Sequence, residues 1–324
     1  MRPAPNWPLI NNLQNETNLI KKVILTGAAG YIGQFAIASL LKKNYEVHAI
    51  SSRPVKFPAS DANVALTWHQ ANLLKPDEIK PLIENIQPTH LLHFAWYVEH
   101  GKFWEAEENT AWLSASIDLA NEFFTGGGAR MVAAGTCAEY DWNARSPFSE
   151  YSTPLRPRTR YGKAKKDLSE LIKILVSDLG RSFASGRIFF PFGGNESPNR
   201  LVPSVIRALL RGEPAKTTHG EQIRDLMYVT DVAEAFAALL ESDVSGAVNI
   251  ASGNGVKIKE VVETLGEITG KTELLEIGAL PASPDEPESI VADVARLQNE
   301  VRFEGQTPLR EALINTVNWW KCHL

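Results

Sequence analysis

The sequence has few of the features that mark secreted, zinc-binding or membrane-spanning proteins. Its two cysteines, Cys137 and Cys322, cannot build a disulfide framework or a cysteine-rich metal site. It contains no apolar run of the roughly 18 residues that a membrane helix requires. Residues 1–20 lack the basic start and apolar core of a secretory signal. We therefore expect a protein of the cytoplasm, with no membrane partner and no metal site.

Basic residues are also too scarce to indicate a nucleic-acid partner. The 33 Lys and Arg residues are outnumbered by 38 Asp and Glu residues, which gives a net charge of −5, whereas a nucleic-acid-binding surface is normally basic. With 44% hydrophobic and 22% charged residues, the composition is that of an ordinary globular protein. A length of 324 residues is enough for one large α/β domain or for two unequal ones.

Short apolar runs alternate with helical patterns as far as about residue 190. We expect strands at Lys21–Thr26, Tyr45–Ser51, His90–Trp96, Arg130–Gly135 and Gly186–Phe190, and helices at Tyr31–Lys43, Pro76–Ile86, Thr110–Phe124 and Arg160–Leu179. Alternation with short connections predicts right-handed crossovers and a parallel sheet with helices on both faces. The predicted fold class is therefore α/β, a Rossmann-type doubly wound sheet with a smaller C-terminal lobe.

The alternation loosens after Pro191, where proline and glycine become frequent. Helices are expected near 202–211, 231–241 and 257–269, and a proline-rich loop at Gly278–Pro287. We predict three parts: an N-terminal arm at 1–19, a dinucleotide-binding domain at 20–190 and 225–250, and a substrate-binding lobe at 191–224 and 251–324.

A glycine-spaced turn follows the first apolar run. Its members are Gly27, Gly30, Tyr31, Ile32 and Gly33, placed where a strand should run into a helix. Glycine permits the tight turn, and the N-terminus of the helix offers free N–H groups and a favourable dipole to an anion. This pattern favours a dinucleotide pyrophosphate at the turn, with an ordinary glycine-rich turn as the alternative.

The end of the second expected strand bears on which dinucleotide binds. An acidic residue there would bind the ribose 2′-hydroxyl of NAD, whereas an arginine would favour the 2′-phosphate of NADP. The chain has Ser51, Ser52 and Arg53 at this point and no acid. Two hydroxyls and a guanidinium suit a phosphate dianion, so we expect NADP(H), unless Arg53 only begins a solvated loop.

Thr136, Tyr161 and Lys165 are the candidate catalytic residues. Tyr161 and Lys165 are four residues apart, so they lie on one face of a helix. We expect the ammonium to lower the pKa of the phenol so that it can move a proton near neutral pH. Thr136 ends an apolar strand at the edge where ligands bind, so its hydroxyl can hold a substrate carbonyl beside Tyr161.

In this order the motifs resemble the extended short-chain dehydrogenase/reductase family of nucleotide-sugar epimerases, dehydratases and reductases. The resemblance covers about residues 21–320. It rests on the glycine turn from Thr26, the strand His93-Phe94-Ala95, Asn109 at the start of a helix, Gly135-Thr136 ahead of Tyr161, the segment Arg224–Ala233 and the ending Thr316–Trp320.

The resemblance implies roles that spacing alone does not assign. Thr136 would polarise the substrate oxygen, Tyr161 would exchange a proton, and Lys165 would bind the nicotinamide ribose. The remaining implied contacts are Asn72, Leu73, Phe94, Ala95 and Trp96 for the cofactor, and Trp96, Tyr97, Thr136, Cys137, Phe190, Leu201, Val202 and Arg224 for a nucleotide-diphosphate sugar. Two long helices resemble the family's dimer interface, which implies a homodimer.

Some of these positions have a plainer interpretation. Cys137 is also what a small, buried packing residue would look like. Arg224 could simply form a surface ion pair with Asp225. The family context favours phosphate binding for Arg224.

Departures from the family pattern narrow the reaction. Cys137 and Ala138 stand where the sugar 4,6-dehydratases of the family carry an Asp-Glu pair, which argues against dehydration. Phe190 replaces the family's phosphate-contacting Asn. We therefore expect NADPH-dependent reduction of the 4-keto group of a dTDP- or CDP-linked 4-keto-6-deoxyhexose. The alternatives are a nucleotide-sugar 4-epimerase and a non-catalytic NADP sensor.

Overall fold

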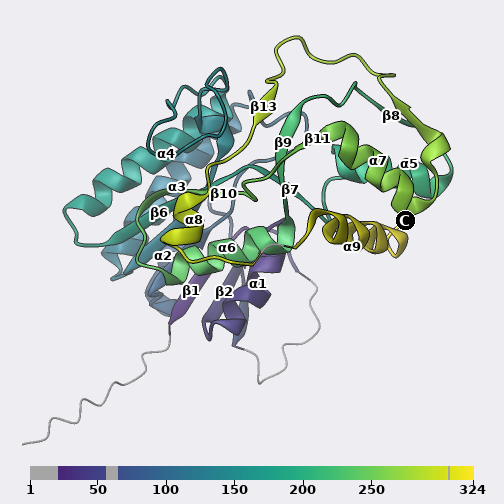
Figure 1. The fold of residues 1–324 in the computed structure, drawn as a ribbon. Helices are drawn as coiled ribbons and strands as arrows, with labels where there is room; N and C mark the ends of the chain where they lie inside the picture. Colours follow the sequence, from purple (N-terminus) through teal and green to yellow (C-terminus); the bar gives the residue numbers. More distant parts are fainter. Residues whose placement is uncertain (1–20, 56–64, 306) are drawn as a thin grey trace, which may run out of the picture.

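The computed structural model describes residues 21–55, 65–305 and 307–324, which form a large α/β part with a smaller lobe at its side (Figure 1). The large part is built on a seven-stranded sheet of order β10-β6-β5-β4-β1-β2-β3, in which every neighbouring pair is parallel. Its strands are β1 Lys22–Thr26, β2 Glu46–Ser51, β3 Leu66–Gln70, β4 His90–His93, β5 Arg130–Thr136, β6 Ser182–Ile188 and β10 Gly246–Ile250. The strand order reverses beside β1, which is where α/β sheets form a ligand crevice.

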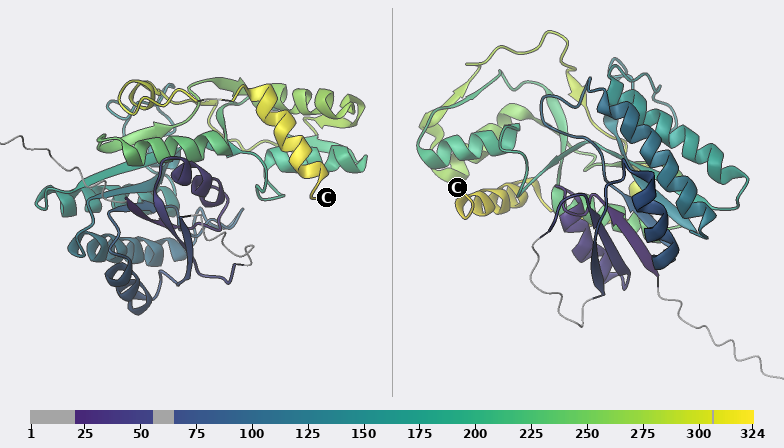
Figure 2. Two further views of the ribbon diagram at one scale, coloured as in Figure 1. Left: turned by 90° about the horizontal axis from the view of Figure 1, so that it is seen from below. Right: turned by 180° about the vertical axis from the view of Figure 1, so that it is seen from behind.

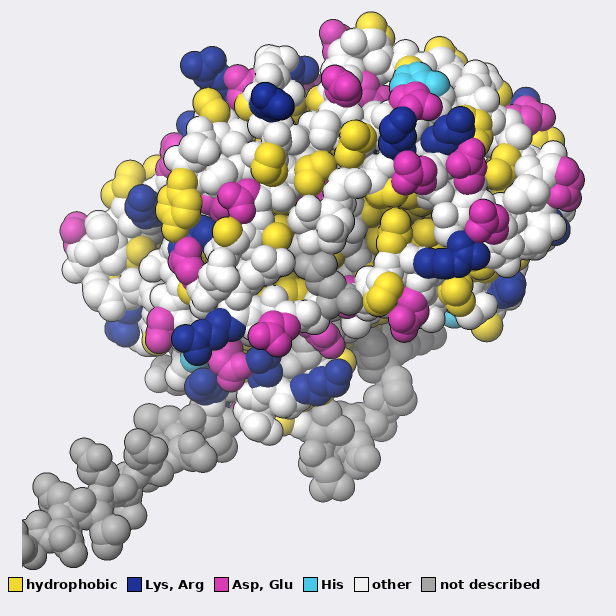
Figure 3. Space-filling view, in the orientation of Figure 1, with side chains coloured by type: hydrophobic (Ala, Val, Ile, Leu, Met, Phe, Trp, Pro, Cys, Tyr) yellow, Lys and Arg dark blue, Asp and Glu magenta, His cyan; other side chains and the backbone are white. Residues whose placement is uncertain are grey.

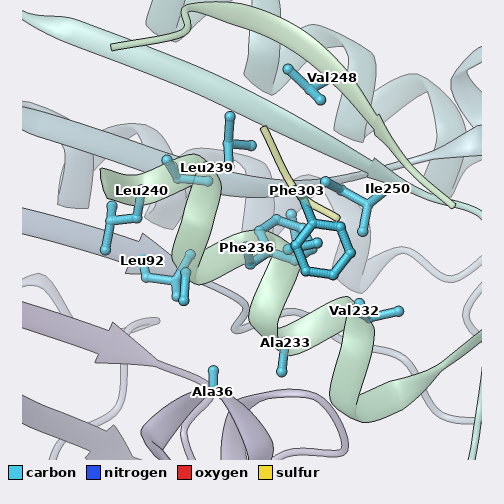
Figure 4. Packing of buried hydrophobic residues seen from close by; sticks show 14 of the residues in the cluster. Ala36, Leu92, Val232, Ala233, Phe236, Leu239, Leu240, Val248, Ile250 and Phe303 are labelled. Carbon is cyan, nitrogen blue, oxygen red and sulfur yellow. The ribbon is translucent and has the colours of Figure 1, made fainter. Parts of the chain in front are cut away.

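Helices cover both faces of this sheet because its strands are apolar on both sides. In β1, Val23 and Leu25 pack with one cluster while Ile24 packs with the other, as the alternation of a strand requires. One face carries α1 Gly33–Lys42 and α6 Val229–Glu241; the other carries α2 Pro76–Ile86, α3 Glu108–Thr125 and α4 Arg160–Ser177. Phe236 of α6 lies beside Phe303 and Ile250 in the first cluster (Figure 4).

The lobe has its own core. Its sheet joins β7 Phe190–Phe192, β9 Ile223–Tyr228, β11 Gly255–Lys257 and β13 Ser289–Ile290, and a separate pair joins β8 Ala215–Thr217 to β12 Leu275–Ile277. Helices α5 Leu201–Arg211, α7 Ile258–Thr269 and α9 Leu309–Lys321 pack together and stand to one side of the large sheet (Figures 1 and 2). The short α8 Ala295–Asn299 returns to the large part, against β10.

The predicted fold class is confirmed, and the expected elements are recovered with shifted ends. β4 stops at His93 rather than Trp96, and β3 was not expected at all. The domain boundary expected at residue 225 stays a prediction: β9 crosses it and pairs within the lobe, whereas α6 and β10 belong to the large part. The arm predicted at 1–19 lies outside the described residues.

The surface agrees with the balanced composition. Cationic and anionic side chains are interspersed over the face shown in Figure 3, with no continuous basic area there. Over the described ranges, no helix is both long and apolar enough to cross a bilayer, and no group of three or more His, Cys, Asp or Glu side chains could hold a metal ion.

Candidate active site

The glycine turn joins β1 to α1 and passes very close to the end of β4. Gly27 has φ +66°, and a Cβ added to it would lie 2.7 Å from the Ala95 backbone nitrogen. A Cβ on Gly33 would lie 2.2 Å from the carbonyl oxygen of Gly27. Side chains at these two positions are excluded because the backbone doubles back on itself there.

This turn presents a row of backbone donors. No acceptor among the described residues faces the N–H groups of Tyr31, Ile32 and Gly33. The first turn of α1 contains no acidic residue and no side-chain cap. Free N–H groups and an uncompensated helix dipole form a ready site for an anion, so the residues present fit a dinucleotide pyrophosphate.

The end of β2 offers less to a phosphate than its sequence suggests. The hydroxyl of Ser51 donates to the Arg53 carbonyl and accepts from the Arg53 N–H, so it closes a local turn. Ser52 and Arg53 are exposed, and the Arg53 guanidinium has no partner among the residues described. Of the three predicted contacts, Ser52 and Arg53 remain free to bind a 2′-phosphate.

Asn72 and Leu73 follow β3, next to the ends of β2 and β1. The Asn72 side chain accepts from the Leu74 N–H and its backbone donates to Glu78, so its oxygen is already used locally. Leu73 lines a surface hollow of about 530 Å³ between α2 and α3. Both residues stay predicted contacts for the adenine.

The segment after β4 crosses in front of the glycine turn. Phe94 is partly buried and packs edge-on against Phe236, with 4.8 Å between ring centroids, so part of its ring belongs to the core. The Trp96 indole is buried and donates to Asn109 Oδ1 at 2.8 Å. The Tyr97 hydroxyl donates to Glu99 at the surface. Ala95 is thus the member of this segment that lies against the turn.

Thr136 ends β5 and begins a single helical turn at Cys137–Glu139. Its N–H donates to Glu139 Oε1 at 2.9 Å, and its hydroxyl accepts from the Ala138 N–H at 3.2 Å. This reciprocal capping fixes the Thr136 hydroxyl at the carboxyl end of the strand. Cys137 is buried, and burial raises the pKa of its thiol to about 12, so the thiol stays protonated near neutral pH. Its packing role and its contact with the substrate both stay predictions.

Tyr161 lies in the first turn of α4, and its phenol is close enough to the Thr136 hydroxyl for that hydroxyl to lower its pKa. The helix can approach this closely because residue 162 is glycine, where a Cβ would lie 2.4 Å from the Ala138 carbonyl oxygen. Thr159 caps the helix by accepting from the Gly162 N–H at 3.1 Å. The structure therefore brings Thr136 and Tyr161 together as predicted.

Lys165 lies one turn further along α4 and is almost fully buried. Its ammonium donates to the Ala134 carbonyl at 2.8 Å and sits 3.8 Å from the centroid of the Trp96 ring. Burial, opposed by the charge of Glu139, lowers the pKa of Lys165 to about 7. The side chain is thus held between β5 and Trp96.

The expectation that Lys165 lowers the pKa of Tyr161 is wrong for this arrangement. Burial raises the phenol pKa well above its ordinary value, opposed by the hydrogen bond from Thr136 and the charge of Arg200. Lys165 does not contribute, because its ammonium is directed at Ala134 and Trp96. A cationic nicotinamide beside the phenol would lower its pKa, which is the effect that was expected of Lys165.

Arg224 on β9 is buried and already paired. Its guanidinium donates to Glu286 at 2.8 Å and to the Pro287 carbonyl at 2.9 Å, and lies 5.6 Å from the Phe190 ring centroid. Asp225 does not pair with it; that carboxylate accepts from Ser252, Gly253 and Ala292 instead. A substrate phosphate would therefore have to displace Glu286 from Arg224.

Leu201 and Val202 begin α5. Val202 is buried in the lobe core, while Leu201 is partly exposed, so only the Leu201 side chain is free to contact a substrate.

A buried ion pair that the sequence did not predict lies next to Thr136. Glu139 Oε2 accepts from Arg187 Nε at 2.8 Å, and both side chains are almost completely buried. Arg187 also donates to the Tyr140 hydroxyl, which in turn donates to Asn249. Parallel pairing sets Arg187 opposite Gly135, but the two charges are far apart in the chain, so spacing gave no signal.

A second missed pair lies beside the glycine turn. Glu196 is buried with one carboxylate oxygen 3.4 Å from Arg200 Nε, while its other oxygen has no partner among the described residues. Burial raises the pKa of Glu196 to about 7, and its charge is felt by Tyr31. Arg200 is the cation that reaches Tyr161, as noted above.

Comparisons with known proteins agree with this geometry. The chain is 26% identical to UDP-glucose 4-epimerase 4 of Oryza sativa subsp. japonica, over 92% of this chain and 90% of the relative. It is 27% identical to UDP-glucose 4-epimerase of Corynebacterium glutamicum, over 89% and 91%.

Solved structures with similar folds cover almost the whole chain. A UDP-glucose 4-epimerase from Thermotoga maritima with UDP-glucose matches with a TM-score of 0.83 at 21% identity, over 93% of this chain and 99% of that one. MoeE5 in complex with UDP-glucuronic acid and NAD matches with a TM-score of 0.81 at 27% identity, over 94% and 100%. The pattern of the NAD dependent epimerase/dehydratase family matches residues 23–251, and the chain therefore belongs to that family.

Proposed function

We propose that the protein catalyses reversible oxidation and reduction at C4 of a nucleotide-diphosphate sugar, with 4-epimerisation as its net reaction. The observation that carries this proposal is the contact between Thr136 and Tyr161 at the carboxyl end of β5, at the same edge of the parallel sheet as the donor row of the glycine turn. The named relatives given above, at 26% and 27% identity over most of the chain, are UDP-glucose 4-epimerases, which supports epimerisation over net reduction.

The protein's own residues would handle one proton and one oxygen. Thr136 Oγ1 would hold the sugar O4. The Tyr161 phenolate, which a cationic nicotinamide beside it would favour, would take the proton from O4 and become the phenol, and the phenol would return that proton to O4 in the reductive half. Bound NAD(P) would supply the acceptor and donor of hydride at C4. The raised phenol pKa means that Tyr161 holds its proton firmly, so it is the acid for the reductive half of the cycle.

The cofactor would be held by three groups of residues. Tyr31, Ile32 and Gly33 would donate to its pyrophosphate. Ala95 would leave room for it in front of the turn, and Ser52 with Arg53 would meet the adenosine ribose. The Lys165 ammonium is bonded to the Ala134 carbonyl, so its side chain would have to change rotamer to reach the nicotinamide ribose.

A second candidate is the NADPH-dependent 4-ketoreductase predicted from the sequence. It is favoured by one observation: the described end of β2 carries no acid, and the exposed Arg53 guanidinium has no partner there. A 2′-phosphate would give this arginine a charge-assisted contact. A reductase exchanges its cofactor in every turnover, whereas an epimerase returns the hydride within one binding event.

One experiment separates the two. The protein is purified, denatured and its released nucleotides identified by mass spectrometry; it is then incubated with UDP-glucose, and in parallel with NADPH and a dTDP-4-keto-6-deoxyglucose substrate. Epimerisation predicts retained NAD and formation of the C4 epimer with no net change at 340 nm, the absorbance of the reduced cofactor. Net loss of NADPH with the keto-sugar, and no epimer, would establish the reductase instead.

Tyr161→Phe tests the catalytic assignment in either case. Removing the hydroxyl leaves the ring and its packing, so cofactor binding should persist while kcat falls by roughly 10²–10⁴-fold, the usual contribution of a general acid–base. Turnover at the wild-type rate in this variant would contradict the mechanism.

A further inference from the structure

Two aromatic side chains stand beside the Tyr161 phenol, and a third extends the row. The Phe103 and Trp104 rings lie edge-to-face with Tyr161, with centroids 4.9 and 5.8 Å away and interplanar angles of 85° and 87°. Trp142 extends the row, 6.0 Å from Trp104 and again nearly perpendicular. All four rings are only partly buried, so each leaves apolar surface in water beside the reacting group.

This aromatic wall (Phe103, Trp104 and Trp142) is fixed to the elements that carry the catalytic residues. The Tyr161 N–H donates to the Trp104 carbonyl at 3.0 Å. Asn109 Nδ2 donates to the Phe103 carbonyl at 2.8 Å. The Trp142 indole donates to the Cys137 carbonyl at 2.9 Å, next to Thr136. The wall therefore keeps its position relative to the atoms that react.

Trp142 also borders a second opening. A cleft of about 500 Å³ lies between residues 142–146 and 284–289, and the partner of Arg224, Glu286, is on its far side. Trp142 thus joins the aromatic row to the cleft that contains Glu286, the partner of Arg224.

The cations near Tyr161 are already matched. Lys165 is bonded to Ala134 and covered by Trp96, and Arg200 is held by Glu196. Arg145 and Arg158 line the cleft beyond Trp142, at the other end of the row. A carboxylate placed against the Phe103 and Trp104 rings, beside Tyr161, would lose hydration without a free cation to replace it, which is strongly unfavourable. A methyl or methylene group would instead remove apolar surface from water on both sides.

We propose that the aromatic wall packs against the apolar edge of the substrate's sugar ring and selects a sugar with a neutral, preferably deoxygenated C6 over one with a C6 carboxylate. This inference rests on the proposed function, because it assumes that a nucleotide sugar reacts at Tyr161. It adds the substrate class: neutral hexoses and 6-deoxyhexoses rather than uronates.

The test measures dissociation constants by calorimetry in the Tyr161→Phe protein with its cofactor bound, so that no turnover occurs. The probes are UDP-6-deoxyglucose, UDP-glucose and UDP-glucuronate, which differ only at C6. The deoxy sugar should bind at least about tenfold more tightly than the uronate. Binding of the deoxy sugar buries the apolar surface of one methyl group, whereas binding of the uronate desolvates a carboxylate that has no cationic partner.

Wall variants then show whether the rings cause the preference. Trp104→Leu and Phe103→Leu keep an apolar side chain but remove the ring, and should reduce the preference for the deoxy sugar by severalfold. Trp104→Phe should restore most of it. Tyr151→Leu is the matched control, because Tyr151 is an aromatic residue that is 77% exposed and whose hydroxyl donates to Glu300 at the surface; it should leave the ratio unchanged.

The outcomes separate this inference from the proposed function. If none of the three sugars binds and none is converted by the wild-type protein, the proposed function is wrong. If all three bind with equal affinity, or the uronate binds best, or the leucine variants leave the ratio unchanged, the aromatic wall does not select the substrate although the function can stand.

Discussion

The burial of Lys165 should make the stability of the protein depend on pH in a way that one substitution reveals. The pKa of this ammonium is lowered from 10.5 to about 7 because it is buried against Ala134 and Trp96. In the unfolded chain it keeps its ordinary pKa, so between pH 7 and 10.5 the unfolded state binds more protons. Stability contributed through this group therefore rises with pH across that range.

The size of the effect follows from the two pKa values. At 1.36 kcal/mol for each tenfold change, the charged side chain lowers the free energy of unfolding by about 5 kcal/mol at pH 6, where it is protonated in both states. At pH 9 the folded protein holds it neutral and the penalty falls to about 2 kcal/mol. Lys165→Met removes the penalty at both values.

We expect Lys165→Met to abolish activity. The free energy of unfolding that the variant gains over wild type should be about 3 kcal/mol larger at pH 6 than at pH 9. Loss of the bond to Ala134 lowers the stability of the variant by the same amount at every pH, so it cancels in this difference. Urea unfolding followed by circular dichroism at pH 6, 7, 8 and 9 measures it.

Lys166→Met is the matched control for this prediction. Lys166 is the next residue of α4, but its ammonium lies 3.3 Å from Glu170 at the surface. The stability difference between this variant and wild type should be small and nearly independent of pH. A difference for Lys165→Met that also stayed constant from pH 6 to 9 would refute the reasoning.

Three further predictions concern the surroundings of the site. Glu139→Gln should lower the free energy of unfolding by about 3–5 kcal/mol, because Arg187 would be left buried without its counter-charge. Glu221→Gln, in the exposed pair with Lys257, should change the free energy of unfolding by less than about 1 kcal/mol. Denaturant titration of both variants measures the two effects. Gly33→Ala should weaken cofactor binding at least about tenfold in a fluorescence titration, since its Cβ would meet the Gly27 carbonyl, and unchanged affinity would count against the turn as the pyrophosphate site. Glu196→Gln should stabilise the protein by about 3 kcal/mol at pH 8 and hardly at pH 4. Burial raises the pKa of Glu196 from 4.5 to about 7, so the stability of the wild type falls as pH rises through that interval. Thermal melts measure the difference, and equal shifts in melting temperature at the two pH values would contradict it.

The features that sequence predicted well are the ones with local causes. The glycine turn was recognisable because close backbone approach at Gly27 and Gly33 leaves no room for side chains. The Thr136–Tyr161 contact followed from a strand end and a helix start that the hydrophobic pattern marks. β3 escaped because it is the edge strand of the sheet, and its partly exposed residues Leu66–Gln70 lack a buried apolar run.

The features that sequence did not predict depend on where buried charges find partners. Lys165 was expected to act on Tyr161 because the two share a helix face, but burial directs its ammonium to the Ala134 carbonyl. The Glu139–Arg187 pair depends on the alignment of β5 with β6. Phe103 and Trp104 lie outside any helix or strand, so no periodicity marks them, and their position beside Tyr161 appears only once the chain has folded.

The return of the chain from the lobe has a consequence for how the protein is made. Residues of the 290–303 segment, among them Ile290, Leu297 and Phe303, belong to the same cluster as Val23 and Phe236. The first strands of the sheet are therefore covered on that side partly by α1 and α6 and partly by residues 290–303, which are synthesised long after those strands. Expressing the first half of the chain by itself should yield an insoluble product, because the apolar face of its sheet would remain exposed to water.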